Sequence, residues 1–260
     1  MCPEYDEFAE FYDHVVPYQN RQDVAFYVGL AREAPTPVLE LACGTGRVLL
    51  PSARAGARMV GLDLSGGMLD VCRAALAHEP PAVQERVTLH QGDMRNFDLG
   101  CSFALITIPF RGFQHLLTVA DQQEALARVR RHLAPGGRLV FDLFNPSLPF
   151  LADERWLREP LTEPAVQLPD GRTLVRSYRV ASRDYHAQTQ DVELVHVTTW
   201  PDGRVEQQPG RFIVRYLFRY EAEHLLVREG FTIDALYSDF DRNPYGASYP
   251  GELIFVARCA

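Results

Sequence analysis

The sequence predicts an α/β fold in which a mostly parallel sheet has helices on both faces and carries an inserted antiparallel β meander. Three observations lead to this prediction. Short apolar runs alternate with helix-compatible stretches over residues 35–145, which is typical of a parallel sheet. Residues 146–219 instead alternate polar and apolar positions between turn signatures. Residues 220–260 return to one helix and two apolar runs, which we expect to complete seven strands.

The composition is that of a globular protein. With 260 residues and 47% hydrophobic content, the chain can form one large domain or a domain with an insert. No apolar run reaches the ~18 residues of a membrane span, and no signal-peptide pattern opens the chain. The net charge of −8 disfavours a nucleic-acid partner. Five scattered cysteines without a C-x-x-C pair indicate neither zinc nor disulfides, so we expect a cytoplasmic protein.

A glycine loop follows the first apolar run. Residues 38–41 are strand-like, Gly44 and Gly46 leave the next turn almost without side chains, and a helix-compatible run follows. Such a turn lets a ligand touch backbone at the carboxyl edge of a sheet. A dinucleotide fingerprint would need a third glycine where Leu49 stands, and no Gly-Lys-Ser/Thr triplet for phosphate follows.

A carboxylate ends the second apolar run, residues 58–62, at Asp63. An acid at that strand tip suits a ribose diol, because a carboxylate accepts two hydroxyl hydrogen bonds. Together with a loop that lacks a phosphate signature, it indicates a nucleoside without a pyrophosphate.

These residues resemble the class I S-adenosylmethionine (SAM)-dependent methyltransferases, whose first motif reads acidic-x-Gly-x-Gly-x-Gly. Glu40 to Gly46 match it, except that Ala42 replaces the first glycine. The resemblance implies a Rossmann-like fold, SAM as cofactor and S-adenosylhomocysteine as product. It places the loop against the methionine half, Asp63 on the ribose and Gly92-Asp93-Met94 on the adenine side. The cofactor-binding residues that it implies are Tyr12, Tyr18, Glu40, Ala42, Cys43, Gly44, Gly46, Asp63, Leu64, Met68, Gly92, Asp93, Met94 and Ile108.

Residues 1–34 are expected to form one or two helices rich in tyrosine and acid. Their aromatic stripe fits either an amphipathic helix packed on the core or a lid over the cofactor. Methyltransferases of this kind often carry a Tyr-Asp pair in such a helix, here Tyr12-Asp13, so Tyr12 and Tyr18 are predicted to reach the SAM carboxylate. Pro35 and Pro37 end this region before the first strand.

Three further strands complete the core at residues 35–145, and the first of them is the strand-like run at residues 86–90 before Gly92-Asp93. Residues 102–108 form an apolar run closed by Pro109, and residues 138–144 form another. Between them, Asp121 is predicted to open a helix as the head of a capping-box variant.

The insert at residues 146–219 carries three expected strands, centred on 174–180, 192–200 and 212–220. Pro-Asp-Gly turn signatures stand at 169–171 and 201–203. We interpret it as a cap over the acceptor pocket, with a homodimer interface as the alternative. Residues 221–229 should form the last helix, and the runs at 231–237 and 253–257 an antiparallel hairpin.

Candidate acceptor-side residues follow the fourth strand. Phe110, Arg111 and His115 are the predicted catalytic residues: Arg111 either binds an acceptor carboxylate or forms a surface salt bridge, and His115 is either a base or a packed histidine. The Asp/Asn-Pro-Pro-Tyr/Phe motif of base-methylating relatives lacks its polar head here, which disfavours a flipped base. Asp142 has no carboxylate partner after the fourth strand, so no metal is predicted.

The sequence therefore predicts a SAM-dependent methyltransferase that acts on nitrogen or oxygen of a small molecule. The insert is similar to that of sugar N-methyltransferases, which favours an amine acceptor. Two alternatives stay open: a SAM-binding protein without methyl transfer, either pericyclase-like or regulatory, and an RNA methyltransferase.

Overall fold

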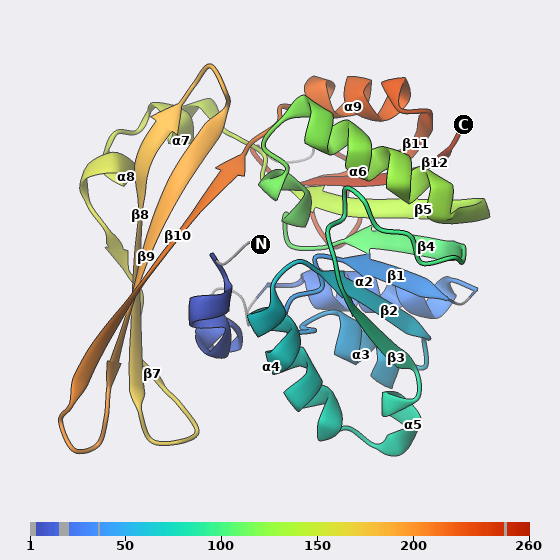
Figure 1. The fold of residues 1–260 in the computed structure, drawn as a ribbon. Coiled ribbons are helices and arrows are strands. Elements are labelled where there is room, and N and C mark those ends of the chain that lie inside the picture. Colours follow the sequence, from blue (N-terminus) through green and yellow to red (C-terminus); the bar gives the residue numbers. More distant parts are fainter. Residues whose placement is uncertain (1–3, 16–20, 36, 247–248) are drawn as a thin grey trace.

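A seven-stranded sheet forms the larger part of the computed structural model, which describes residues 4–15, 21–35, 37–246 and 249–260 (Figure 1). Its strand order is β11-β12-β5-β4-β1-β2-β3. Strands β5, β4, β1, β2 and β3 lie side by side in that order and pair in parallel. Strand β12 runs antiparallel to both β5 and β11. The predicted fold class is confirmed. The bounds are β1 Val38–Leu41, β2 Met59–Asp63, β3 Val87–Gln91, β4 Phe103–Ile108, β5 Leu133–Leu143, β11 Phe231–Tyr237 and β12 Leu253–Cys259.

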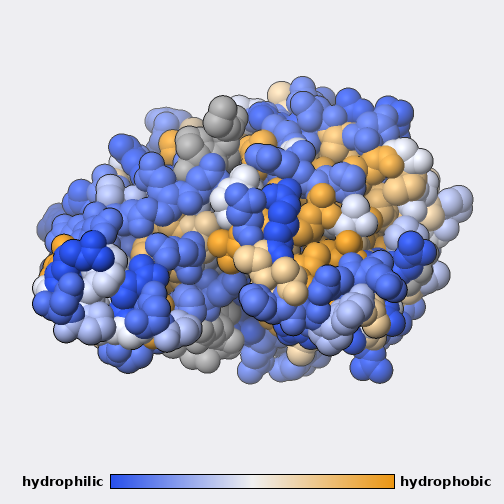
Figure 2. Space-filling model, turned by 60° about the horizontal axis from the view of Figure 1, so that its bottom comes forward, coloured by the Kyte–Doolittle hydropathy of each residue, from blue (hydrophilic) through white to orange (hydrophobic). Residues whose placement is uncertain are grey.

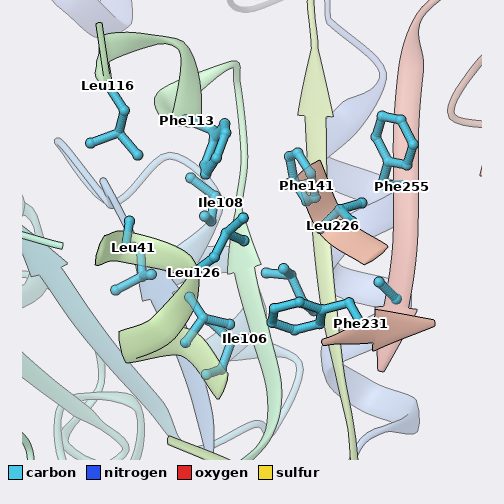
Figure 3. Packing of buried hydrophobic residues seen from close by; sticks show 14 of the residues in the cluster. Leu41, Ile106, Ile108, Phe113, Leu116, Leu126, Phe141, Leu226, Phe231 and Phe255 are labelled. Atoms are coloured by element: carbon cyan, nitrogen blue, oxygen red, sulfur yellow. The ribbon is translucent and has the colours of Figure 1, made fainter. Parts of the chain in front are cut away.

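Helices cover both faces of this sheet because its central strands are apolar on both sides. On one face α6 (Val119–His132) and α9 (Arg219–Arg228) pack on the sheet, with Leu126 and Leu226 in one cluster with Ile106 and Phe141 (Figures 1 and 3). On the other face lie α2 (Asp23–Glu33), α3 (Leu49–Arg54) and α4 (Gly66–Ala77). The short α5 (Pro81–Gln84) precedes β3.

A second, antiparallel sheet stands beside the first, at the left of Figure 1. Its order is β10-β9-β8-β6, with β7 also paired to β8. Two short helices, α7 (Leu148–Ala152) and α8 (Arg155–Arg158), lead into it from β5. The bounds are β6 Leu161–Thr162, β7 Val166–Gln167, β8 Thr173–Asp184, β9 Thr189–Thr199 and β10 Val205–Arg215.

The N-terminal 3₁₀ helix η1 (Asp6–His14) lies between the two sheets (Figure 1). Its Phe8 and Phe11 are buried in a cluster with Leu174 and Leu194 of the second sheet. On its other side, Asp6 accepts hydrogen bonds from the Gly67 amide and the Ser65 hydroxyl at the start of α4. One short helix therefore connects the insert with the core.

Several predicted boundaries are wrong, among them the start of the fifth strand, which is Leu133 rather than residue 138. Helix α6 begins at Val119, because Thr118 is its N-cap and Asp121 stands at the third helical position of the capping box. The third long strand of the insert ends at Arg215, and α9 begins at Arg219 rather than 221. Both Pro-Asp-Gly signatures do form turns, after β7 and after β9.

The surface view in Figure 2 shows hydrophilic residues over most of the visible face, with hydrophobic residues in patches among them. Within the part of the chain that the structure describes, no helix has both the length and the apolar character needed to span a membrane.

Candidate active site

A cavity of about 850 Å³ opens where the carboxyl ends of β1, β2 and β4 face the second sheet. The glycine loop and the strand tips line one side, and residues of α7, α8 and β8–β10 line the other. Cavities of ~300–1,000 Å³ hold drug-sized ligands, so this one has room for a nucleoside and a second small molecule.

The glycine loop is shaped by three residues with positive φ. Ala42 has φ 54°, Gly44 φ 54° and Gly46 φ 85°. A Cβ on Gly44 would lie 3.1 Å from the Cε of Met68, and one on Gly46 would lie 2.6 Å from the Sγ of Cys72. The Gly44 amide donates to Asp63 Oδ2 at 2.8 Å, which ties the loop to the tip of β2. Ala42 thus occupies a left-handed position that favours glycine.

Asp63 and Asp93 stand at neighbouring strand tips in different settings. Asp63 also accepts from the Ser65 amide at 2.8 Å, and burial raises its pKa above the ordinary value. Asp93, after β3, is bonded to Arg95 at 2.6 Å, and these side-chain hydrogen bonds lower its pKa. Both carboxylates line the cavity.

Glu40 is the most unusual carboxyl of the site. It is 2% exposed, and its Oε2 has no hydrogen-bond partner among the residues that the structure describes. Burial raises its pKa to about 8. A buried acceptor without a partner at a cavity wall is a place for a donor or a cation.

His115 lies on the cavity wall at the end of η2 (Gly112–His115), between the two sheets. Its Nε2 is 3.1 Å from the Tyr5 hydroxyl, and the Tyr5 ring stacks on Phe212 of β10 with centroids 5.5 Å apart. Burial lowers the pKa of His115 to about 4, so the imidazole is neutral at neutral pH.

Phe110 and Arg111 form a left-handed turn after β4, with φ 53° and 65°. Asp142 holds this turn, because its Oδ1 accepts from the Phe110 amide at 2.8 Å. The fully buried Asp142 also accepts from Arg21 at 2.8 Å and Tyr27 at 2.7 Å, so its oxygens are committed to the protein. Arg111 pairs with Glu252 at 3.1 Å, the salt bridge that the sequence left as one of two alternatives.

Comparison with known proteins supports a methyltransferase family. A model described as a methyltransferase domain matches residues 38–137. The dTDP-3-amino-3,6-dideoxy-alpha-D-glucopyranose N,N-dimethyltransferase of Streptomyces fradiae is 27% identical over 88% of this chain and 85% of its own. The CcbJ methyltransferase of Streptomyces caelestis superimposes with a TM-score of 0.73 at 25% identity, covering 99% and 98% of the two chains. SAM-bound CalS10, an amino pentose methyltransferase from Micromonospora echinaspora, gives 0.68 at 25% identity, covering 96% of each chain.

Residues 38–137 therefore match a methyltransferase domain, and the chain is similar over most of its length to SAM-dependent methyltransferases. It is therefore an enzyme that uses SAM, as the sequence predicted. The alternative of a SAM-binding protein without methyl transfer is set aside, since the relatives and solved structures described above are methyltransferases.

The residues at the core side of the cavity fit this cofactor. SAM carries an ammonium and a sulfonium charge, and the partnerless Oε2 of Glu40 offers a buried acceptor for a cation. The lone pairs that Asp63 retains beyond its two backbone bonds suit a ribose diol. Gly44 leaves the loop backbone open to the ligand.

The cavity brings together most of the residues that the sequence singled out. Two do not line it: Gly46 packs under Cys72, and Ile108 lies fully buried in the core. Tyr18 lies outside the described residues. His196 is packed between Phe8 and Phe11, away from the cavity. The lining residues among those predicted are Tyr12, Glu40, Ala42, Cys43, Gly44, Asp63, Leu64, Met68, Gly92, Asp93, Met94, Phe110, Arg111 and His115.

Sequence reasoning missed two cavity residues, Tyr5 and Arg95, and the role of the buried Asp142 behind the cavity wall. Tyr5 was read only as part of an aromatic stripe, and Arg95 had no signal beyond its place two residues after Asp93. Asp142 was considered only as a metal ligand, whereas it holds the Phe110 turn. Contacts between elements far apart in the chain define the roles of Tyr5 and Asp142.

Proposed function

We propose that this methyltransferase transfers the methyl group of SAM to an amine nitrogen of a small molecule, bound between the glycine loop and the second sheet. The observation that carries the proposal is the neutral His115 on the wall of that cavity, bonded to Tyr5. The relatives from Streptomyces fradiae and Micromonospora echinaspora, named for methylation of amino sugars, support an amine acceptor.

Bound SAM supplies an electrophilic methyl group, and an amine attacks it only through a free lone pair. The proton of an ammonium acceptor is lost to solvent, and His115 accepts a hydrogen bond from the neutral amine, directly or by way of the Tyr5 hydroxyl, which orients the nitrogen lone pair. A side chain with a pKa of about 4 is a weak base. It suits an amine, which loses its proton to solvent, better than a hydroxyl, whose deprotonation needs a much stronger base.

The rest of the rate enhancement comes from positioning of the acceptor against the methyl group. Phe110 is held by the Asp142 bond to its amide and by Arg21 and Arg47, whose guanidinium carbons lie 5.1 and 4.7 Å from its ring centre. A fixed wall at this point orients the acceptor, and orientation can lower a barrier by about 7–11 kcal/mol.

These contacts support a separate role for each segment of the chain. Residues 1–34 act as a lid, residues 35–145 bind SAM, residues 146–219 roof the acceptor site, and residues 220–260 complete the core sheet. We favour a roof over a dimer interface because residues from α7, α8 and β8–β10 line the cavity itself.

RNA is a poor fit as acceptor. The cavity wall holds five carboxylates, at Glu4, Glu40, Asp63, Asp93 and Asp121, and the chain carries a net charge of −8. A phosphate backbone would be repelled at such a mouth.

The test is a panel of paired small molecules that carry either an amine or a hydroxyl at the same position. S-adenosylhomocysteine release and product mass are measured for each pair. We expect methylated product from amines only. His115→Gln should lower kcat by about tenfold to a hundredfold without changing the affinity for SAM. Methylation of the hydroxyl member at an equal rate would overturn the assignment to nitrogen.

A further inference from the structure

The two walls of the cavity differ in charge. Ten residues of the insert line it, all within the described part of the chain, and none carries a formal charge. Five of them are aromatic: Phe150, Trp156, Tyr178, Phe212 and Tyr216. All of the charged lining residues belong to the core or to the N-terminal segment.

Three of these aromatic residues, Phe150, Trp156 and Tyr178, form a continuous row. Phe150 meets Phe144 with ring centres 5.3 Å apart and Trp156 at 5.2 Å, and Trp156 stacks on Tyr178 at 6.2 Å. Such a surface binds the apolar face of a sugar or an aryl group, and its contact area gives affinity without charge.

Every arginine that lines this cavity is already paired with a carboxylate, and of their nitrogens only the Nε of Arg111 is buried without a hydrogen-bond partner among the described residues. Three arginines line it, the undescribed residues include no arginine, and the chain has no lysine. Each arginine is already bonded to carboxylates: Arg47 to Asp23 at 2.6 Å, Arg95 to Asp93 and Asp121 at 2.6 Å each, and Arg111 to Glu252 at 3.1 Å. Arg183 lies over Phe150 but donates to the Leu151 and Asp153 carbonyls and does not line the cavity.

A nucleoside diphosphate brings two or more negative charges. Burying each without a paired cation costs several kcal/mol, and the carboxylates of the core wall would add repulsion. Sites that bind diphosphates compensate the phosphate charge with arginine or lysine side chains or with unpaired backbone amides. The acceptor wall, built from the uncharged faces of β8–β10, offers neither cation.

We propose that the acceptor reaches this enzyme free of a nucleoside diphosphate carrier, as an amine attached to an uncharged body that stacks on the aromatic row. This rests on the proposed amine methylation and narrows its substrate class. The proposed acceptor differs in its carrier from that of the Streptomyces fradiae relative, which is named for a dTDP-linked sugar.

A matched pair of substrates tests the proposal. One is the phenyl glycoside of 3-amino-3,6-dideoxyglucose, and the other is the same sugar linked to thymidine diphosphate. They present the same amine and differ only in the carrier. We expect kcat/KM for the phenyl glycoside to be higher by at least about tenfold. A preference for the nucleotide-linked sugar would overturn the proposal and leave amine methylation standing.

Binding gives an answer that does not depend on turnover. Thymidine diphosphate is titrated into the enzyme loaded with S-adenosylhomocysteine, and calorimetry follows the heat. We expect no binding up to about 1 mM, and measurable binding below that concentration contradicts the proposal. If neither glycoside is methylated at nitrogen, amine transfer to this sugar class fails, whereas the diphosphate titration still decides the question of the carrier.

The two tryptophans of the chain provide variant and control. Trp156 belongs to the aromatic row, whereas Trp200 lies outside the cavity against Arg204. Trp156→Ala should raise KM for the phenyl glycoside by about tenfold and leave the affinity for SAM unchanged. Trp200→Ala should leave both unchanged. Equal KM values for Trp156→Ala and the wild type would remove the aromatic row from acceptor binding.

Discussion

At the scale of single residues, the site depends on carboxylates that the protein keeps in different protonation states. Glu40 is buried without a partner for Oε2, whereas Asp63 accepts two backbone amides and Asp93 is paired with Arg95. The pKa of Glu40 is about 8, and that of Asp93 is lowered. This difference in pKa matters because a cationic ligand favours the ionised form of Glu40.

The affinity for SAM should therefore depend on pH through Glu40. Its folded pKa of about 8 lies above the ordinary 4.5, so the ligand-free protein is stabilised below pH 4.5 and loses that contribution as the pH rises to 8. Binding of a cation needs the ionised form, so affinity should rise by up to about tenfold per pH unit below 8.

Calorimetry at pH 6, 7 and 8 in two buffers of different ionisation enthalpy measures this effect. Proton release on binding should appear in the wild type and be absent in Glu40→Gln. If the two proteins show the same pH dependence, the cation lies away from Glu40.

Asp63 provides a second residue-scale prediction. Asp63→Ala removes the acceptor of the Gly44 and Ser65 amides as well as the acid for the ribose. We expect SAM binding to weaken by about 1.5–3 kcal/mol. The measurement is the dissociation constant of SAM. Asp70→Ala removes the same charge from an exposed position of α4 and serves as the control. An unchanged constant in Asp63→Ala would place the ribose elsewhere.

At the scale of elements, the start of α6 couples stability to the site. Thr118 caps the helix through the Asp121 amide, and Asp121 in turn bonds Arg95 at the cavity wall. Thr118→Ala should lower the free energy of unfolding by about 1 kcal/mol, because a backbone donor loses its partner.

Thr118→Ser keeps the hydroxyl and should behave like the wild type. Denaturant unfolding with a common m value measures both variants. Equal stabilities for the alanine and serine variants would contradict the role of the cap.

The elements also show what sequence patterns could and could not predict. Apolar runs and turn signatures predicted the order of strands, since burial on both sheet faces leaves a direct trace in the sequence. The start of α6 was placed at Asp121, because an aspartate at the third helical position looks like a cap until its bond to Thr118 is seen. Tyr5 and Asp142 were missed as site residues because their partners, His115 and Phe110, lie far along the chain.

At the scale of the whole molecule, η1 packs between the two sheets and contacts both the second sheet and helix α4 of the core. Phe11 is 3% exposed within the cluster of the second sheet, and Asp6 of the same helix accepts from the Gly67 amide at 2.9 Å. Burial of one large aromatic side chain contributes about 1.5–3 kcal/mol, which is enough to link two unfolding equilibria.

The two tryptophans test this coupling, because Trp156 and Trp200 both belong to the insert whereas the cofactor residues belong to the core. S-adenosylhomocysteine at about a hundred times its Kd should stabilise the protein by about 2.7 kcal/mol. In a coupled molecule, the midpoint followed by tryptophan fluorescence should shift as far as that followed by far-UV circular dichroism. Phe11→Ala should separate the two midpoints, whereas Phe11→Leu should keep them together. If the ligand does not shift the fluorescence midpoint of the wild type, the insert unfolds independently of the core.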